Sequence, residues 1–69
     1  MDVVRYRLVV EGELGPRYAS AFDEMDLEAG DGRTVIAGDV TDQAHLQGLI
    51  DRIARLGLNL VSVTPAGDR

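Results

Sequence analysis

The chain has 69 residues, no cysteine, and twelve acidic against seven basic side chains, which give a formal net charge of -5 at pH 7. A chain this short forms one domain, residues 1–69, and its core is small. Without cysteine, neither a disulfide nor the commonest zinc sites can stabilise this core. Self-association is the remaining way to stabilise it. The negative charge disfavours nucleic acid and anionic lipid as partners, whereas it suits a second protein with a basic surface.

The first predicted element is a strand over residues 4–14. Apolar side chains occupy most even positions and charged side chains most odd ones: Val4, Tyr6, Leu8, Val10 and Leu14 against Arg5, Arg7, Glu11 and Glu13. A period of two is typical of a strand with one buried face. Gly12 and then Gly15-Pro16 interrupt the pattern, which predicts a turn after the strand.

Residues 16–22 fit two structures. Tyr18 and Phe22 are spaced so that they share one face of either a helix or a strand. Pro16 at a first helical position favours one or two helical turns. If the segment is a strand instead, the shift in the apolar pattern that follows it requires a bulge near Asp23-Glu24.

A β-hairpin is predicted next. Apolar and acidic residues alternate before a turn, and an apolar run follows it: Met25-Asp26-Leu27-Glu28-Ala29, then Gly30-Asp31-Gly32, then Thr34-Val35-Ile36-Ala37. An Asp-Gly pair between two such runs is a typical hairpin turn. The acidic side chains Asp26, Glu28 and Asp31 lack the ligand spacing and the terminal glutamate of a calcium loop, so we interpret them as solvated.

The strongest pattern in the chain predicts a helix that ends at Gly57. Its apolar residues recur at the spacing of one helical face: Leu46, Leu49, Ile50 and Ile53. Thr41 or Asp42 can cap its start, with acid in the first turn. Asp51 and Arg55 are predicted to form an exposed ion pair.

Residues 58–64 are predicted to form the last strand, and a Schellman ending of the helix would place Leu58 against Ile53. The order of elements predicts an α+β fold: a ferredoxin-like four-stranded antiparallel sheet with one long helix and a short or missing first helix. The helix covers one face of this sheet. The other face would show Arg5, Arg7, Val9, Val61 and Val63, or their partners of opposite parity, so we expect a dimer through that face or through an edge strand.

Few side chains are suited to catalysis, because the chain has one histidine and no cysteine, lysine or tryptophan. Asp42 and His45, three residues apart on the helix, could act as a general base or bind a metal. A helix cap with an exposed neighbour is the simpler interpretation, and two ligands do not make a metal site. Ser20 and Ser62 lack the glycine-flanked turn of a nucleophile. We therefore expect no enzyme, no metal and no cofactor.

Gly48 lies beside the apolar stripe of the helix, where glycine costs about 1 kcal/mol relative to alanine. We expect something to approach closely there, either the helix's own sheet or a partner or ligand. The aromatic pair Tyr18 and Phe22 has two similar interpretations, as core or as a recognition surface.

The helix and the strand after it carry a motif: Asp42-Gln43-Ala44, Leu46 and Gly48-Leu49, closed by Leu56-Gly57-Leu58-Asn59-Leu60-Val61-Ser62-Val63. In this motif, and more loosely in residues 18–22, the chain resembles a group of short, uncharacterised actinobacterial proteins. Those proteins tend to have tryptophan in place of Tyr18 and Ala21 and histidine in place of Gln47. The resemblance implies no activity, and a role that depends on that histidine could not be performed here in the same way.

We interpret the chain as a non-catalytic, homodimeric binding module. No apolar run approaches the roughly 20 residues of a membrane span, and no apolar signal core follows a basic start, so we expect a cytoplasmic protein. The predicted contact residues lie on the first strand, around the aromatic pair and on the polar side of the helix: Arg5, Arg7, Tyr18, Phe22, Gln43, Gln47 and Asp51. The alternative is an ACT-like regulatory domain that senses a small ligand between paired subunits.

Overall fold

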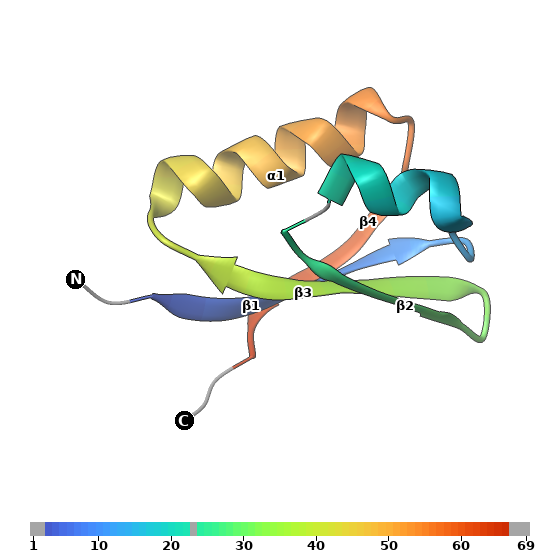
Figure 1. Cartoon of the computed structure of the whole chain (residues 1–69), viewed down its shortest axis with the longest axis horizontal. Coiled ribbons are helices and arrows are strands. Elements are labelled where there is room, and N and C mark those ends of the chain that lie inside the picture. The colour runs from blue at the N-terminus through green and yellow to red at the C-terminus, as the bar shows by residue number, and fades with distance from the viewer. Residues whose placement is uncertain (1–2, 23, 67–69) are drawn as a thin grey trace.

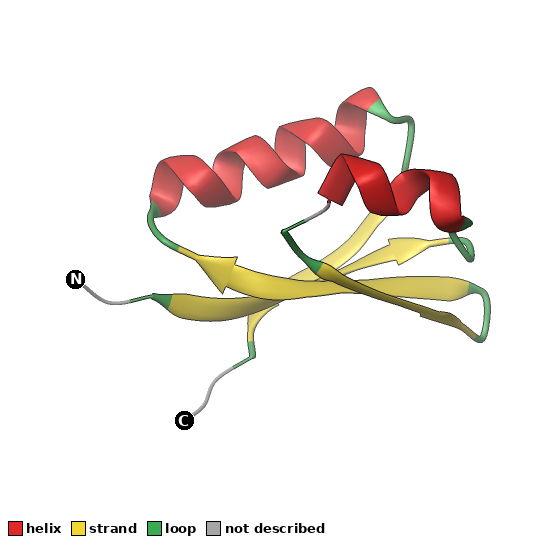
Figure 2. Ribbon diagram, viewed as in Figure 1, coloured by secondary structure: helices red, strands yellow, loops and turns green. Residues whose placement is uncertain are grey.

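The computed structural model describes residues 3–22 and 24–66. Its elements are β1 (Val4–Glu11), the 3-10 helix η1 (Pro16–Phe22), β2 (Asp26–Gly30), β3 (Arg33–Val40), α1 (Gln43–Arg55) and β4 (Leu60–Pro65). Both helices lie on one face of the sheet (Figures 1 and 2). Within the described ranges, neither helix is long and apolar enough to cross a membrane.

The four strands form one open sheet in the order β2-β3-β1-β4, and every neighbouring pair is antiparallel. β1 and β3 occupy the centre, while β2 and β4 are the edges. The predicted α+β class, with a four-stranded antiparallel sheet and one main helix, is therefore confirmed. We call the side of the sheet beneath the helices the covered face and the opposite side the open face (Figure 1).

β1 is shorter than the alternating pattern predicted, because the chain turns at Gly12, whose φ is 90°. Leu14 does not continue the strand but packs partly buried against the core. The fully buried Thr34 holds this turn in place. Its hydroxyl donates to the Gly12 carbonyl oxygen at 2.8 Å and accepts from the Leu14 N–H at 2.9 Å.

Residues 16–22 form η1, so the helical interpretation is confirmed and the strand interpretation is wrong. Pro16 begins the helix as predicted, and Asp23, where a bulge was expected for a strand, lies outside the described residues. The sheet's bulge is in β4 instead. There Val61 is the extra residue between the pairs Val9–Ser62 and Val10–Leu60.

β2 and β3 form the predicted hairpin. Asp31 and Gly32 are the two central turn residues, with φ values of 56° and 77°, and a type I′ turn requires positive φ at both. The turn sets the register of the hairpin, in which Asp26 lies opposite Ala37 and Glu28 opposite Val35. β3 continues past the predicted run to Val40.

α1 has the predicted ends but not every predicted contact. Asp42 is the N-cap, and its carboxylate accepts the His45 backbone N–H at 2.8 Å; the first turn itself contains no acid. At the other end, Gly57 has a φ of 77°, and the Leu58 N–H donates to the Ile53 carbonyl oxygen, which is the Schellman bond. Among the described residues, Asp51 and Arg55 do not form the predicted ion pair.

The core lies between the covered face and the two helices. Its buried members come from β1, η1, β3, α1 and the residue before β2: Leu8, Val10, Phe22, Met25, Ile36, Val40, Leu49 and Ile53. Gly38 belongs to this layer, and a Cβ added to it would overlap the Met25 side chain. Gly48 is the reverse case: it is exposed, and a Cβ there would meet nothing within 4 Å, so the predicted close approach by the sheet is wrong.

The open face differs from prediction in β4. Val63 pairs with Leu8 and packs against the core, whereas Ser62 and Thr64 pair with Val9 and Arg7 and therefore share the open face. The prediction placed Val63 on the same face as Arg5, Arg7 and Val9, or all of their alternates together, and this is wrong, because the odd positions of β1 share a face with the even positions of β4. The sequence of β4 alone does not show which of its side chains face the helices. The pairing with β1 determines this.

Candidate binding surface

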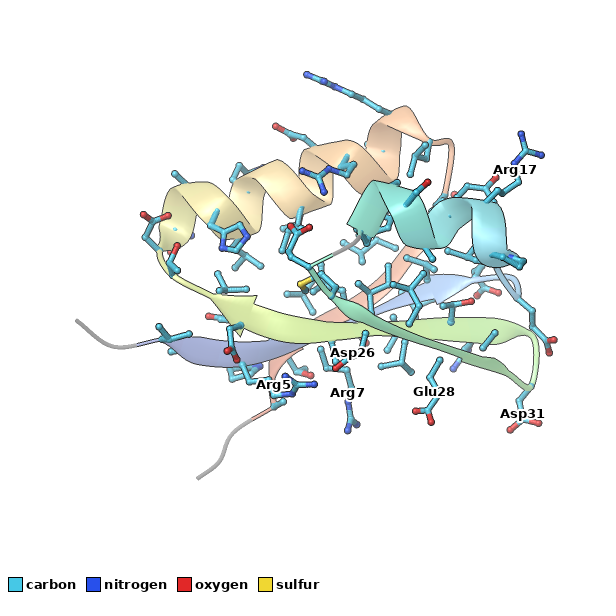
Figure 3. All side chains as sticks on the ribbon, viewed as in Figure 1. Arg5, Arg7, Arg17, Asp26, Glu28 and Asp31 are labelled. Atoms are coloured by element: carbon cyan, nitrogen blue, oxygen red, sulfur yellow. The ribbon has the colours of Figure 1, made fainter. Side chains whose placement is uncertain are left out.

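The candidate functional site is the open face, because no described element packs over it (Figures 1 and 3). Cross-strand partners point to the same side of a sheet, so the register identifies its members. They are Arg5, Arg7, Val9 and Glu11 on β1, Asp26 and Glu28 on β2, Arg33, Val35, Ala37 and Asp39 on β3, and Ser62 and Thr64 on β4. The surface combines charges of both signs with small apolar side chains.

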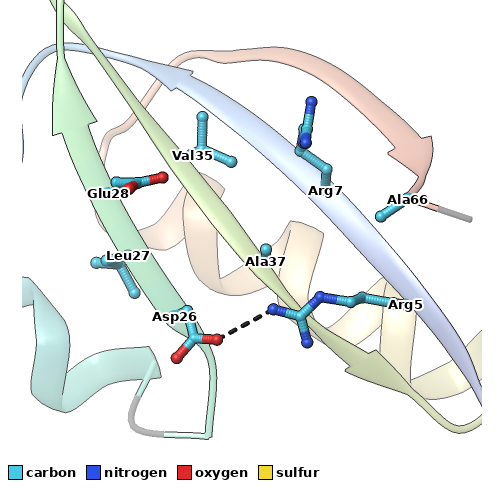
Figure 4. A pocket seen from close by; sticks show the side chains of 8 residues that line it. All are labelled: Arg5, Arg7, Asp26, Leu27, Glu28, Val35, Ala37 and Ala66. Atoms are coloured by element: carbon cyan, nitrogen blue, oxygen red, sulfur yellow. Dashed lines mark hydrogen bonds and ion pairs between the residues drawn. The ribbon is translucent and has the colours of Figure 1, made fainter.

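A hollow of about 400 Å³ lies on this face over β1, β3 and β2. Val35 and Ala37 on β3 lie between the charged side chains of the two neighbouring strands (Figure 4). The hollow is lined by Arg5, Arg7, Asp26, Leu27, Glu28, Val35, Ala37 and Ala66. Its volume is within the range of small-ligand sites, which is about 300–1,000 Å³.

Arg5 bridges three strands at one end of the hollow. Its Nη2 lies 3.0 Å from Asp26 Oδ2 on β2, and its Nη1 lies 3.9 Å from Asp39 Oδ1 on β3. The Arg5 side chain is 47% exposed, so water screens both ion pairs. The two carboxylates nevertheless compensate its charge and orient the guanidinium across β3 (Figure 4).

Arg7 and Glu28 flank the hollow from opposite sides, and neither forms an ion pair with another described residue. Figure 4 shows them on either side of Val35. A guanidinium and a carboxylate left uncompensated next to an apolar floor can both form charge-assisted hydrogen bonds to an incoming group. This arrangement is suited to binding a partner with polar and apolar contacts.

The structure divides the sequence-predicted contact residues between two sides of the molecule. Arg5 and Arg7 lie on the open face, whereas Gln43, Gln47 and Asp51 are exposed on α1, beyond the covered face. Tyr18 is half-buried on η1. Phe22 is fully buried in the core, which removes it from any surface that a partner could contact.

The sequence did not predict four residues of this site: Asp26, Glu28, Val35 and Ala37. Asp26 and Glu28 were interpreted only as a solvated cluster. The signal that identifies them is the two-residue turn Asp31-Gly32, because its register brings the acids of β2 beside the small apolar residues of β3. Their distance from Arg5 and Arg7 depends on the pairing of β1 with β3, which no local signal reveals.

Asp42 and His45 do not form the acid–imidazole pair considered from the sequence. The Asp42 carboxylate caps the helix, and the His45 imidazole Nδ1 lies 3.2 Å from the Thr41 backbone N–H, which donates to it. The imidazole Nε2 is 3.9 Å from Glu24 Oε2. This geometry places the start of α1 beside Glu24, in the segment after η1.

Arg52 provides a second connection between the two helices. Its Nη1 donates to the Ala21 carbonyl oxygen at 2.7 Å and lies 3.7 Å from Glu24 Oε2. The guanidinium carbon is also 5.7 Å from the centre of the Phe22 ring, within cation–π range. These contacts join residues about thirty positions apart, and they support η1 rather than form a site.

The side chains that commonly hold metals are dispersed. Within residues 3–22 and 24–66, no three histidine, aspartate or glutamate side chains come close enough together to hold a metal ion. The acids of the hairpin, Asp26, Glu28 and Asp31, are exposed, and Asp26 is engaged by Arg5.

One family model matches the chain, a domain of unknown function (DUF8691), over residues 5–64. No curated protein and no solved structure matches it significantly. The matched range contains the whole sheet apart from its outermost residues, both helices and the hairpin. The chain therefore belongs to this family of unknown function.

Proposed function

We propose that this member of the family is a non-catalytic, homodimeric binding module that engages another protein through its open face. The observation that carries the proposal is the uncompensated pair Arg7 and Glu28 on either side of an apolar floor, on a sheet face that no described element covers. The apolar members of this face, Val9, Val35 and Ala37, are half-buried among charged side chains, and a partner that packs on the face would bury them further. The strand order with antiparallel neighbours supports a ferredoxin-like arrangement in which η1 replaces the first helix.

The charge of the chain favours a partner with a basic surface. The formal charge is -5, and the hollow has two carboxylates on its β2 side, of which Glu28 is free of ion pairs within the described residues. A basic partner would be attracted by the field of the whole molecule and would pair directly with Glu28. Arg7 would then bind an acidic or carbonyl group beside it.

The test compares two acid-to-arginine variants that change the charge equally. The tagged protein is used to isolate proteins from lysate of its source cell, and the affinity of each purified candidate is measured for the wild type, Glu28→Arg and Asp51→Arg. Glu28→Arg should weaken binding at least about tenfold, because it reverses a charge at the contact. Asp51→Arg, on the exposed side of α1, should change the affinity less than about threefold.

Two outcomes would contradict the proposal. A partner whose binding is lost with Asp51→Arg and retained with Glu28→Arg would assign the interaction to α1 instead. If no protein is enriched over an untagged control, the protein-binding proposal fails.

The hollow favours one alternative of a different class, small-ligand sensing by an ACT-like domain. A guanidinium and a carboxylate across a small apolar floor suit a zwitterion such as an amino acid, whose carboxylate would bind Arg7 and whose ammonium would bind Glu28. A ligand at 100 times its Kd stabilises the folded state by about 2.7 kcal/mol, which a melting curve detects easily. Unchanged melting temperatures across an amino-acid panel would eliminate this alternative.

We also infer that the protein is cytoplasmic and that its family is actinobacterial. All seven basic side chains are arginine, which a GC-rich genome favours. Family members that lack the Asp42-Gln43-Ala44 motif, or that come mostly from other phyla, would contradict this inference.

A further inference from the structure

The two edges of the sheet differ in charge. The β2 edge carries Asp26 and Glu28 and leads into Asp31, so two copies of it would repel each other. β4, the opposite edge, has no ionisable side chain. It belongs to the longest uncharged stretch of the chain, which begins at Leu56 and includes Ala66.

Exposed apolar side chains gather at the uncharged edge. The described residues include five large hydrophobic side chains that are exposed, and two of them, Leu60 and Val61, lie in β4, while a third, Leu56, is the C-cap of α1. Val61 is 41% exposed and Leu60 is 37% exposed. A soluble protein usually protects an edge strand with charge, and this edge has none.

The backbone of β4 limits where another strand can pair. An edge strand has a row of N–H and C=O groups that no neighbour satisfies. The bulge at Val61 disturbs this row at one end, and Pro65 has no N–H at the other. Between these points successive residues direct their N–H and C=O groups to opposite sides, and the bond from the Ala66 N–H to the Arg5 carbonyl oxygen sets the phase so that the groups of Val63 face outward. Val63 is therefore the centre of the segment 62–64 that is open to pairing.

We propose that β4 pairs antiparallel with β4 of a second copy of this chain. The proposal rests on the self-association proposed above and assigns its surface. A two-fold axis at Val63 would place Ser62 opposite Thr64 of the copy and Val61 opposite its Pro65, so an exposed apolar side chain becomes covered. Two chains of charge -5 repel over most of their surfaces, and the uncharged edge is where they can approach with the least repulsion.

This arrangement has a consequence for the open face. A two-fold axis perpendicular to the sheet keeps both pairs of helices on one side. The two open faces then continue one another across an eight-stranded sheet, and both hollows remain accessible. A partner with two equivalent sites would gain avidity from this arrangement.

The first experiment measures the dimer dissociation constant by sedimentation for the wild type, Val61→Asp and Val4→Asp. Val4 is the matched control, because it is also an exposed strand valine, 41% exposed, but it lies at the start of the central strand β1. Val61→Asp should raise the Kd at least about tenfold, since it places an unpaired charge in an apolar contact. Val4→Asp should leave the Kd within about threefold. Circular dichroism spectra establish that each variant is folded.

The second experiment remains informative if Val61→Asp unfolds. Because the native chain has no cysteine, single cysteines introduced at Ser62, Val63 and Thr64 can report on the contact without background. Val63→Cys alone, or Ser62→Cys mixed with Thr64→Cys, should form a disulfide-linked dimer on mild oxidation, because the two-fold axis places these positions opposite each other with Cα atoms about 4.5–5.5 Å apart. Glu28→Cys, on the other edge, should not.

The outcomes separate this proposal from the proposed function. A dimer that withstands Val61→Asp, or that cross-links through Glu28→Cys and not through β4, overturns the assignment while homodimerisation stands. A wild type that stays monomeric, with a Kd weaker than about 1 mM, overturns both the β4 interface and homodimerisation but leaves partner binding through the open face intact.

Discussion

The two faces of the sheet are built by the same strands and have opposite properties. On the covered face, Leu8 and Ile36 are 0% and 1% exposed and pack under the helices. On the open face, their immediate neighbours Arg7 and Val35 line the hollow. Adjacent residues in one strand point to opposite faces of the sheet. A substitution on the covered face should therefore affect stability, and one on the open face should affect binding.

The largest effect is expected from Phe22→Ala, which removes the aromatic side chain that anchors η1 in the core. The side chain is fully buried, and such a truncation costs about 3–5 kcal/mol in the free energy of unfolding. A domain of this size has only about 5 kcal/mol, so the variant should be largely unfolded. Urea denaturation followed by circular dichroism measures this. A loss below about 1 kcal/mol would mean that η1 is not part of the core in solution.

Thr34→Val tests the buried polar contact on the covered face. The isosteric valine leaves the Gly12 carbonyl oxygen and the Leu14 N–H without their partner. Both hydrogen bonds are only partly buried, and a typical hydrogen bond contributes about 0.5–1.5 kcal/mol, so we expect a loss of about 1–3 kcal/mol in the free energy of unfolding. Faster amide exchange at Leu14 should accompany it. An unchanged exchange rate would show that the turn does not depend on Thr34.

Gly38→Ala and Gly48→Ala form a matched pair. A Cβ at Gly38 would overlap Met25 Sδ in the core, so Gly38→Ala should lower the free energy of unfolding by about 1–3 kcal/mol. The Cβ of Gly48→Ala meets open space, and alanine should stabilise the helix by about 1 kcal/mol. Melting temperatures of the two variants should therefore move in opposite directions. A lower melting temperature for Gly48→Ala would contradict the exposure of this glycine.

The smallest effect on stability is expected on the open face. Asp26→Asn removes the 3.0 Å ion pair with Arg5, which is exposed to water and is worth about 1 kcal/mol or less. The melting temperature should change little. Binding of a basic partner should weaken, because the hollow loses one negative charge. If stability falls by more than about 2 kcal/mol, the two faces are not as independent as their burial indicates.

Several elements could be predicted from the sequence because short-range contacts determine them. The N-cap Asp42 and the glycine at position 57 act within one helical turn: α1 begins directly after Asp42, and Gly57 follows its C-cap Leu56. The Asp31-Gly32 turn likewise determines the hairpin register by its own backbone geometry. Pro16 indicated the helical form of η1 for the same reason.

The candidate site could be predicted only in part. Arg5 and Arg7 were identified by the alternation of β1, whereas their counterparts Asp26 and Glu28 become neighbours through strand pairing across β3. Phe22 was expected to be either core or surface, and it is core because η1 docks beside α1, where Arg52 meets it. A helix or strand shows which side is apolar but not what lies against it.

By itself, the sequence determined the class of fold, the helix with its ends, the hairpin turn and the parity of β1, because these depend on interactions between residues close together along the chain. Only the tertiary structure decided which side of β4 faces the helices, that Gly48 is exposed, and that one face of the sheet remains open with Arg7 and Glu28 across its hollow. The exposure of Gly48 depends on how α1 packs on the sheet. The other two features depend on the register of strands that are distant in the chain, and an extra residue such as Val61 shifts that register without any local sign.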